Sequence, residues 1–476
     1  MAQKRVQTGK PAGIFAPAKL AAKRKKFDGA IRKMKAKGAE FIYYEIINYQ
    51  GLPQGKMTHI DRLSPAGVGF SNVYFAVTYG PEVFVAPDYA NFDDGFPNVY
   101  AIPDLDTLCQ WPWAPQRTSV LCDAYYEDGT PNMYCPRNVL KSLVERYDRL
   151  GIEVRMGIEY EVYAYKIDEQ KLREKRYDEL EPLGEIPDFW SFHKNPSYFP
   201  YAEEFMRRME GVGLPVEVVH TELGNGSLEY AMRPQSALKA ADAAMRSKLY
   251  LKQMMGDEGY IITFMTMPRA DELGCGGHHH VSLWKNGKPL LYDPKTGDLS
   301  KIGGQFVAGI CETLPDLHLL MRTTMNAYRR IDVSHWTPEC NAWGYDNKCC
   351  AMRFIKGTSP STYRFENRTP GADVNPYLSV SAMLAGGLYG IENKLKPKPP
   401  QEGTPDLKDP RWKPLATTLK GSATALRKSK IARGYLGDDL VNRVLYKTEA
   451  ELESWGKRKL GDKVTEWELD RYFQSA

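Results

Sequence analysis

Charged side chains recur at every second position in three segments that otherwise have the composition of β-strands. Residues two apart in a strand project from the same face of a sheet. A sheet face that carries this many charges cannot be a dry core, so these segments must border a polar site. The alternating side chains are Glu159 and Glu161 in the first segment, His278, His280 and Ser282 in the second, and Arg364, Glu366 and Arg368 in the third.

A fourth segment places Glu222 and Glu229 on either side of a Gly-rich turn. A solvated strand face explains any one of the four segments well enough. Together they predict a site in which several carboxylates and imidazoles face cations. Hard oxygen ligands accompanied by an imidazole suit Mg²⁺ or Mn²⁺.

Strand-like and helix-like runs are mixed along the chain without a regular βαβ alternation, which predicts an α+β fold with an antiparallel sheet. Residues 41–131 are strand-like and rich in turn residues. Pro136 then opens an amphipathic helix that Gly151 closes. The predicted parts are a basic arm and helix over 1–38, a small β-rich domain over 39–135, and a larger domain over 136–476.

Composition limits the class of protein. The chain has 476 residues, of which 42% are hydrophobic and 26% charged, as in ordinary globular proteins. No apolar run reaches the ~20 residues that span a bilayer, so we expect no membrane partner. The eight cysteines are scattered without a C-x-x-C pair, which excludes a disulfide framework and a zinc-site spacing. With no apolar signal core at its start, the chain is expected in the cytoplasm.

The net charge is only +5, and the basic excess is concentrated in residues 1–38, where Asp28 is the single acid. A solvated arm and helix explains this run, and contact with a neighbouring subunit is the alternative. We expect no nucleic-acid binding, because no aromatic residues are interleaved with the charges.

Several longer runs resemble the glutamine synthetase family. The most specific is YRFENRTPGADVNPYLSVSAMLAGGLYGI, which combines R-x-E-x-R, NPYL and a helix of small residues. The other runs are GIEYEVYAY, HTELGNGSLEY, TFMTMPRADELGCGGHHHVSLW and RRIDVSHWTPECNAWGYDNKCCAMR, with WELDRYF near the end. The resemblance extends over residues 40–476 and implies a β-grasp domain followed by a catalytic domain with a curved antiparallel sheet. It also implies active sites between subunits of a ring-like homo-oligomer, a dodecamer of two stacked rings.

The resemblance implies an ATP-dependent ligase that joins the γ-carboxylate of glutamate to an amine through γ-glutamyl phosphate. Two or three Mg²⁺ or Mn²⁺ ions would bind in each site. The implied ligands are Glu161, Glu222 and Glu229 for the metal nearer glutamate, and Glu159, His278 and Glu366 for the metal between the ATP phosphates.

The substrate contacts that the resemblance implies involve the same segments. Lys348 stands where the family usually has an arginine, which keeps the charge but loses the bidentate fork. Leu273 replaces a family asparagine beside the glutamate-binding glycine, so one polar contact to the amino acid is absent. The implied residues are His280, Ser282, Lys348, Arg353 and Arg364 for ATP, and Gly274, Arg330 and Arg368 for glutamate.

The chain departs from the family around the amine. Ser71 stands where the family has an ammonium-binding acid, and Trp336 stands where a mobile flap carries a glutamate, although Glu339 follows closely. Tyr198 matches a family tyrosine near the amine. Losing both acids disfavours the ammonium cation, and an indole can stack on a ring. We therefore expect an apolar or aromatic, aniline-like amine. Ammonia or a small alkylamine remains the alternative.

Two other classes of function remain open. A phosphotransferase of the guanidino-kinase kind shares the fold family but makes no amide, and the NPYL run and Arg330 argue against it. A catalytically inactive structural relative would not need all six implied metal ligands, because an unpaired buried polar cluster is destabilising.

Overall fold

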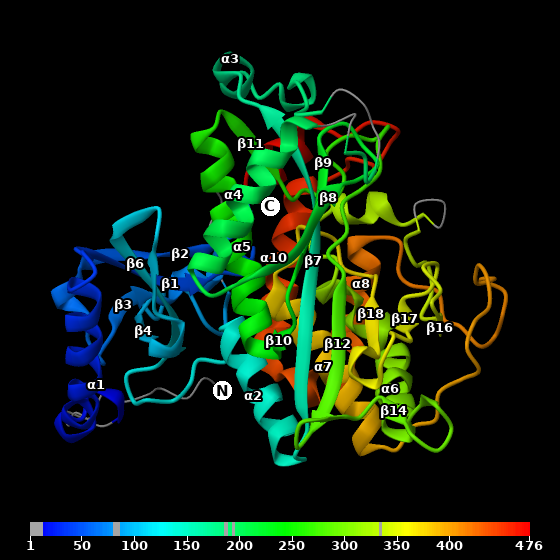
Figure 1. The fold of residues 1–476 in the computed structure, drawn as a ribbon, viewed down its shortest axis with the longest axis horizontal. Helices are drawn as coiled ribbons and strands as arrows, with labels where there is room; N and C mark the ends of the chain where they lie inside the picture. The colour runs from blue at the N-terminus through cyan, green and yellow to red at the C-terminus, as the bar shows by residue number, and fades with distance from the viewer. Residues whose placement is uncertain (1–12, 80–85, 185–188, 193–195, 333–335) are drawn as a thin grey trace.

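The computed structural model describes residues 13–79, 86–184, 189–192, 196–332 and 336–476. These residues form two large sheets and a set of covering helices, with the N-terminal sheet at one side of the molecule (Figure 1). The α+β class expected from the sequence is therefore confirmed. The first part of the predicted basic arm, residues 1–12, lies outside the described residues.

The N-terminal sheet has six strands in the order β2-β1-β6-β4-β3, with β5 paired to β6. β1 and β6 run parallel and the other neighbours run antiparallel. Helix α1 (Pro17–Lys35) packs beside this sheet and buries Phe27 and Met34. The strands are β1 (Phe41–Ile47), β2 (Pro53–His59), β3 (Val68–Ser71), β4 (Asn98–Pro103), β5 (Cys109–Trp111) and β6 (Ala114–Tyr125).

The larger sheet has ten strands, with the main order β16-β17-β18-β12-β7-β9-β8. Strands β10 and β11 also pair with β7, and β13 pairs with β12. The long strand β7 thus joins both halves of the sheet. The strands are β7 (Glu153–Lys166), β8 (Val216–Thr221), β9 (Ser227–Met232), β10 (Gln235–Ser236), β11 (Tyr260–Thr263), β12 (His279–Lys285), β13 (Lys288–Pro289), β16 (Trp343–Tyr345), β17 (Met352–Ile355) and β18 (Arg364–Asn367).

One edge of this sheet departs from the antiparallel arrangement that we expected. β16 and β17 run parallel, whereas the other strand pairs in the described part of this sheet are antiparallel. The chain between them turns at Asp346, which has a left-handed φ of +48°, and then returns to the end where β16 began. A separate small pair, β14 (Tyr292–Asp293) and β15 (Asp298–Leu299), lies outside this sheet.

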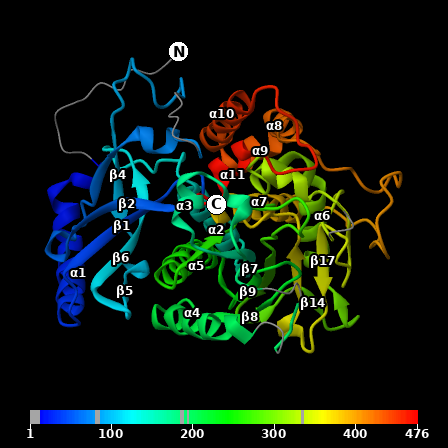
Figure 2. The same cartoon turned by 90° about the horizontal axis from the view of Figure 1, so that it is seen from above.

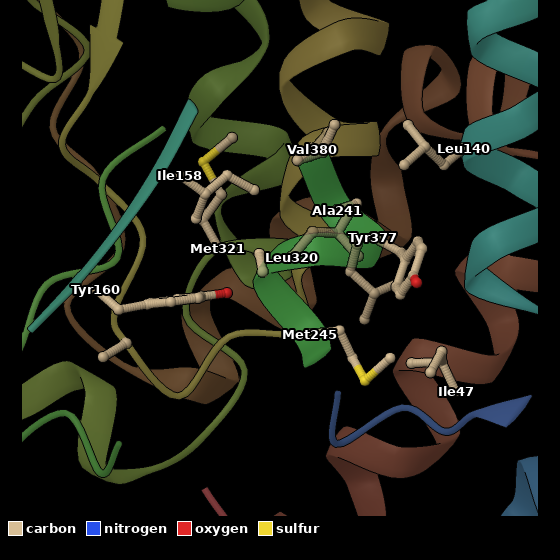
Figure 3. Close-up of a cluster of buried hydrophobic side chains, with 14 of the residues drawn as sticks. Ile47, Leu140, Ile158, Tyr160, Ala241, Met245, Leu320, Met321, Tyr377 and Val380 are labelled. Carbon is tan, nitrogen blue, oxygen red and sulfur yellow. The ribbon is translucent and has the colours of Figure 1, made fainter. Parts of the chain in front are cut away.

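Helices cover one face of the ten-stranded sheet. Figure 3 shows this core, in which Ile158 and Tyr160 of β7 pack toward Ala241 of α5 and Val380 of α7. Because β7 alternates, the residues between these positions project from the opposite face. The helices are α2 (Pro136–Arg149), α3 (Glu169–Arg173), α4 (Phe199–Gly211), α5 (Ala237–Asp257), α6 (Lys301–Leu317), α7 (Pro376–Glu392), α8 (Leu419–Lys428), α9 (Lys430–Leu436), α10 (Asp438–Trp455) and α11 (Glu466–Tyr472).

Buried ion pairs fix the N-terminal sheet against the rest of the chain. Arg137 of α2 is 1% exposed and contacts Asp123 of β6 and Asp242 of α5. Arg246 of α5 donates from Nη2 to Glu45 of β1 at 2.8 Å. Removing one partner of such a pair costs about 3–5 kcal/mol, so these contacts hold the two sheets in a defined relation.

Among the described residues, none of the helices combines the length and the apolarity needed to cross a membrane.

Candidate functional site

Two rows of side chains cross the open face of the larger sheet, and both follow from strand register. In the first row, His280 of β12 lies opposite Glu366 of β18, and Glu366 lies opposite Arg353 of β17. In the second row, Glu161 of β7 lies opposite Glu229 of β9 and, beyond it, His220 of β8. Directly opposed residues share a face, so register alone gathers these charges.

The first row belongs to a buried cluster of carboxylates and imidazoles. His278 Nδ1 lies 2.6 Å from Glu159 Oε1 and 3.6 Å from Glu366 Oε1. His280 Nε2 lies 3.4 Å from Glu159 Oε2. One ligand atom from each of Glu159, His280 and Glu366 falls within 4.8 Å of the others, so these residues can hold one metal ion. His280, which the resemblance placed beside ATP, therefore lies within metal-ligating reach.

Three arginines surround this cluster. Arg353 Nη1 donates to Glu366 Oε2 at 3.0 Å, and Arg368 Nη1 donates to the other oxygen of Glu366. Arg364 Nε donates to His280 Nδ1 at 3.2 Å. Burial raises the pKa of Glu366, but Arg368 and the two histidines outweigh it and lower that pKa to about 2. Arg368 lies just beyond the end of β18, although the sequence placed it in the strand.

A second cluster lies at the β8–β9 edge. His220 Nε2 is 3.0 Å from Glu229 Oε1, and His220 Nδ1 is 3.9 Å from Glu222 Oε1. Ligand atoms of these three residues also fall within 4.8 Å of one another. The sequence analysis missed His220. The signal was present, because His220 and Glu222 have the same two-residue spacing as the other pairs.

Burial and neighbouring carboxylates disfavour the charged form of Glu222 and Glu229 in the second cluster. Burial raises the pKa of Glu229 to about 8, and the charges of Glu159 and Glu161 add to the effect. Burial and the charge of Glu161 likewise raise the pKa of Glu222. Crowded buried carboxylates with imidazole neighbours are a donor set that fits Mg²⁺ or Mn²⁺, whose positive charge would offset this repulsion.

Glycines bring a loop close against the clusters. The N–H of Gly276 donates to Glu161 Oε2 at 2.6 Å. A Cβ built at Gly276 would lie 2.5 Å from His278 Nε2, and one at Gly274 would lie 2.8 Å from the Thr266 carbonyl oxygen. Gly274 therefore has no room for a side chain against the backbone, and a side chain at Gly276 would displace the charged groups of the site. The sequence analysis singled out Gly274 but missed Gly276, which contacts the charged residues directly.

Arg330 and Arg368 provide hydrogen-bond capacity for a substrate. Arg330 Nη2 lies 3.4 Å from His278 Nε2. Within the described part of the chain, the buried Nε atoms of Arg330 and Arg368 have no hydrogen-bond partner. Two buried guanidinium groups with free donors beside carboxylate clusters are suited to bind the carboxylates of an amino acid.

The remaining residues expected around ATP lie nearer the surface. Lys348 is exposed in the turn between β16 and β17. Ser282 follows His280 on the same face of β12, and its Oγ accepts a hydrogen bond from Trp284 Nε1 at 2.9 Å.

The residues expected around the amine are dispersed. Tyr198 is 4% exposed and lines a small pocket together with Thr221 and Glu222. Trp336 is 47% exposed with a left-handed φ of +51°, and residues 333–335 of the expected flap lie outside the described residues.

Ser71 belongs to the N-terminal sheet rather than to the sheet that carries the two clusters. It ends β3, and Figures 1 and 2 place that side of the N-terminal sheet across the molecule from β16–β18. Its Oγ donates to the Phe96 carbonyl oxygen at 3.3 Å. Within a single chain, the end of β3 therefore does not lie beside β16–β18.

A family model described as "Glutamine synthetase, catalytic domain" matches residues 133–472. The chain belongs to the glutamine synthetase family. It is 31% identical over 427 residues to a glutamate–isopropylamine ligase from Pseudomonas sp, covering 89% of this chain and 92% of that protein. It is 32% identical over 456 residues to a type-1 glutamine synthetase 2 from Dictyostelium discoideum, covering 94% and 86%. A gamma-glutamylethanolamide synthetase from Streptomyces coelicolor is 30% identical over 431 residues, covering 89% and 90%.

The fold of this glutamine synthetase family member also matches solved structures. A novel glutamine synthase homolog superposes with a TM-score of 0.77 at 23% identity, covering 89% of this chain and 96% of that one. A ligand-free GmaS structure gives a TM-score of 0.76 at 24% identity, covering 92% and 97%. Family membership makes the protein a carbon–nitrogen ligase, and it confirms the family that the sequence motifs predicted.

Proposed function

We propose that the protein uses ATP to join the γ-carboxylate of glutamate to an amine, releasing ADP and phosphate. The observation that carries the proposal is the pair of carboxylate clusters that strand register gathers on one sheet face, bordered by arginines. A structural scaffold has no use for such a face, because it costs stability unless cations occupy it.

The chemistry requires the γ-carboxylate to be activated first. One of its oxygens attacks the γ-phosphorus of ATP, ADP leaves, and an acyl phosphate forms. The amine nitrogen then attacks the acyl carbon, phosphate leaves with that oxygen, and the nitrogen loses a proton. Two anions must meet in the first step, which is why the site needs positive charge.

The chain's own residues divide this work. We assign Arg330 and Gly274 to binding glutamate and Arg368 to its γ-carboxylate. The positive charge at the phosphates would come from Arg353, Arg364 and Lys348, with His280 and Ser282 at the nucleotide. These assignments follow from the family resemblance, and the contacts of Arg353, Arg364 and Arg368 with the first cluster support them.

The metal ligands are proposed in two sets. Bound Mg²⁺ or Mn²⁺ would neutralise charge on the phosphates and the carboxylate. The first set combines the predicted residues with His280, and the second adds His220 to the predicted carboxylates. The proposed ligands are Glu159, His278, His280 and Glu366 in the first set, and Glu161, His220, Glu222 and Glu229 in the second.

We further propose that the amine has an apolar or aromatic body. Ser71 and Trp336 stand where acids are expected around ammonium. The relatives named for isopropylamine and for an ethanolamide are consistent with an amine larger than ammonia. Ammonia as the amine remains the competing proposal, since other relatives of the chain, including the Dictyostelium discoideum protein, are named glutamine synthetases.

An amine panel tests both parts of the proposal. Phosphate release from ATP and glutamate is measured with ammonia, methylamine, isopropylamine, ethanolamine, aniline and chloroanilines. We expect release to depend on glutamate and kcat/KM to be highest for an apolar amine. If ammonia has the highest kcat/KM, the proposed amine class is wrong. If no amine supports glutamate-dependent release, the ligase proposal itself fails.

We also propose that the protein assembles as a ring-like homo-oligomer, a dodecamer of two stacked rings. Within one chain β3 lies across the molecule from the site, so Ser71 can border an amine only if a neighbouring copy supplies it. Light scattering on the purified protein should give twelve times the mass of 54.0 kDa, and a monomer would contradict this.

A further inference from the structure

Four aromatic residues that no prediction assigned, Phe189, Trp190, Phe192 and Phe199, stand at the edge of the second cluster. We call them the aromatic rim. Resting on the proposed ligase function, we infer that this rim receives the apolar body of the amine and that Trp190 is its principal contact. Trp190 would then determine amine specificity, a role distinct from activating glutamate.

The backbone of the rim is attached directly to the strand that carries the second cluster. The N–H of Trp190 donates to the Thr221 carbonyl oxygen at 3.1 Å, and the N–H of Ser191 lies 3.4 Å from Thr221 Oγ1. The next residue along the chain is Glu222. The indole of Trp190 also meets the ring of His220 edge-on, with centroids 6.2 Å apart and planes at 80°.

The conformation of Trp190 is unfavourable for a structural residue. Its φ of +59° lies in the left-handed region, which bulky side chains avoid. Its side chain is nevertheless 59% exposed, so the strain does not serve core packing. Phe189, 40% exposed, packs edge-on against it at 4.7 Å. A strained, exposed aromatic beside a charged cluster is typical of a ligand contact.

A second set of rings also leads to the second cluster. Phe192 is 74% exposed and stacks on Phe199, with centroids 5.5 Å apart and planes at 6°. Phe199 stacks in turn on Tyr198 at 4.7 Å. Tyr198 lines the pocket that also contains Glu222. Both sets of rings therefore lie next to the carboxylates of the second cluster.

This arrangement complements an amine with an apolar body. The nitrogen can point toward the second cluster while the body lies against the rings, which favour aromatic and alkyl groups. Ammonia has no body to contact the rim. The competing occupant of these exposed rings is a neighbouring copy of the chain, and the experiment below includes it as an outcome.

Two substitutions separate the ring of Trp190 from its backbone strain. Trp190→Asn removes the ring with a residue that tolerates a left-handed φ, and Trp190→Phe keeps an aromatic ring. Leu407→Ala removes another exposed apolar side chain, 47% exposed, outside the site. The measured quantity is kcat/KM for aniline divided by kcat/KM for ammonia. We expect Trp190→Asn to lower this ratio about tenfold. Trp190→Phe should retain most of the ratio, and Leu407→Ala should leave it unchanged.

A binding measurement tests the role of the rim separately from turnover. Calorimetry gives the affinity of aniline for the wild-type and Trp190→Asn proteins with ADP and glutamate present. Weaker aniline binding to the variant supports the role of the rim, even if no amine is turned over. The lack of turnover would contradict only the ligase proposal. Equal binding overturns the rim. An equal fall of both kcat/KM values, or a change in oligomer mass caused by Trp190→Asn, would also overturn it by giving Trp190 a structural or interface role.

Discussion

The two sides of the site are built in different ways. On the proposed activating side, Glu366 is 1% exposed, and strand pairing places His280 and Arg353 opposite it. On the proposed amine side, Trp190 and Trp336 are half exposed, lie outside strands and have left-handed φ values. A rigid sheet face suits a reaction step shared by a whole family, whereas loop residues can change with the amine without disturbing it. The comparison predicts that substitutions in the sheet cause large losses of activity. Substitutions in the loops should instead change which amine is preferred.

Removing divalent metal should have the largest effect. Treatment with EDTA should abolish glutamate-dependent phosphate release, and Mg²⁺ or Mn²⁺ should restore it. Metal should also raise the unfolding temperature, because it binds the folded carboxylate clusters; at 100 times Kd the stabilisation is about 2.7 kcal/mol. In Glu229→Gln, which removes one carboxylate of the second cluster, we expect a smaller rise. Full activity in EDTA would contradict both proposed metal sites.

Substituting the first cluster should have the next largest effect. Glu366→Gln removes the carboxylate that Arg353 and Arg368 share, and we expect kcat to fall about 100-fold or more. Circular dichroism must accompany the assay, because breaking these buried pairs can cost about 3–5 kcal/mol of stability.

Two further variants make this result interpretable. Glu161→Gln alters a carboxylate that makes fewer ion pairs than Glu366 does. A loss of activity in Glu161→Gln is therefore harder to attribute to unfolding. Glu312→Gln removes a surface carboxylate that pairs with Lys413, and its activity should stay at the wild-type level. Wild-type kcat in both cluster variants would contradict their role.

Returning the expected acids to the amine side should change specificity more than rate. In the double variant Ser71→Asp, Trp336→Glu we expect kcat/KM for ammonia to rise relative to isopropylamine by about tenfold, since one recovered charge contact is worth about 1.4 kcal/mol. The single variants serve as controls. An unchanged ratio would mean that neither position borders the amine.

The smallest effect should come from Lys348. Lys348→Arg restores the guanidinium fork expected for the family, and we predict a change in KM for ATP within about threefold, because the residue is exposed and its charge is retained. Lys348→Ala is the matched loss of charge and should raise KM further. An equal KM in both variants would place Lys348 away from the phosphates.

Much of the activating side was predictable because strand alternation is visible in sequence. In the three segments that contain Glu159, His278 and Glu366, charged residues two positions apart identified the charged face before any contact was known. Pairing between strands is not visible in sequence, and this is why His220 and the closeness of His280 to Glu159 were missed.

The rest depended on tertiary contacts. Helix α6 was not anticipated; its Gly309 packs so closely on α7 that a Cβ there would lie 2.2 Å from the Gly386 carbonyl oxygen. The parallel pairing of β16 and β17 depends on a turn at Asp346 that no simple pattern announces. The aromatic rim lies in a segment without periodicity, so only its contacts with β8 connect it to the site.

Oxygen transfer tests the central claim most directly, namely that this sheet face activates the γ-carboxylate with ATP. Glutamate labelled with oxygen-18 in that carboxylate is incubated with the protein, ATP, metal and the best amine, and the released phosphate is analysed by mass spectrometry. The account predicts that each phosphate carries one labelled oxygen, because the bond from the carboxylate oxygen to phosphorus persists when the amine displaces phosphate. Unlabelled phosphate would mean that water attacks ATP, and it would contradict the account.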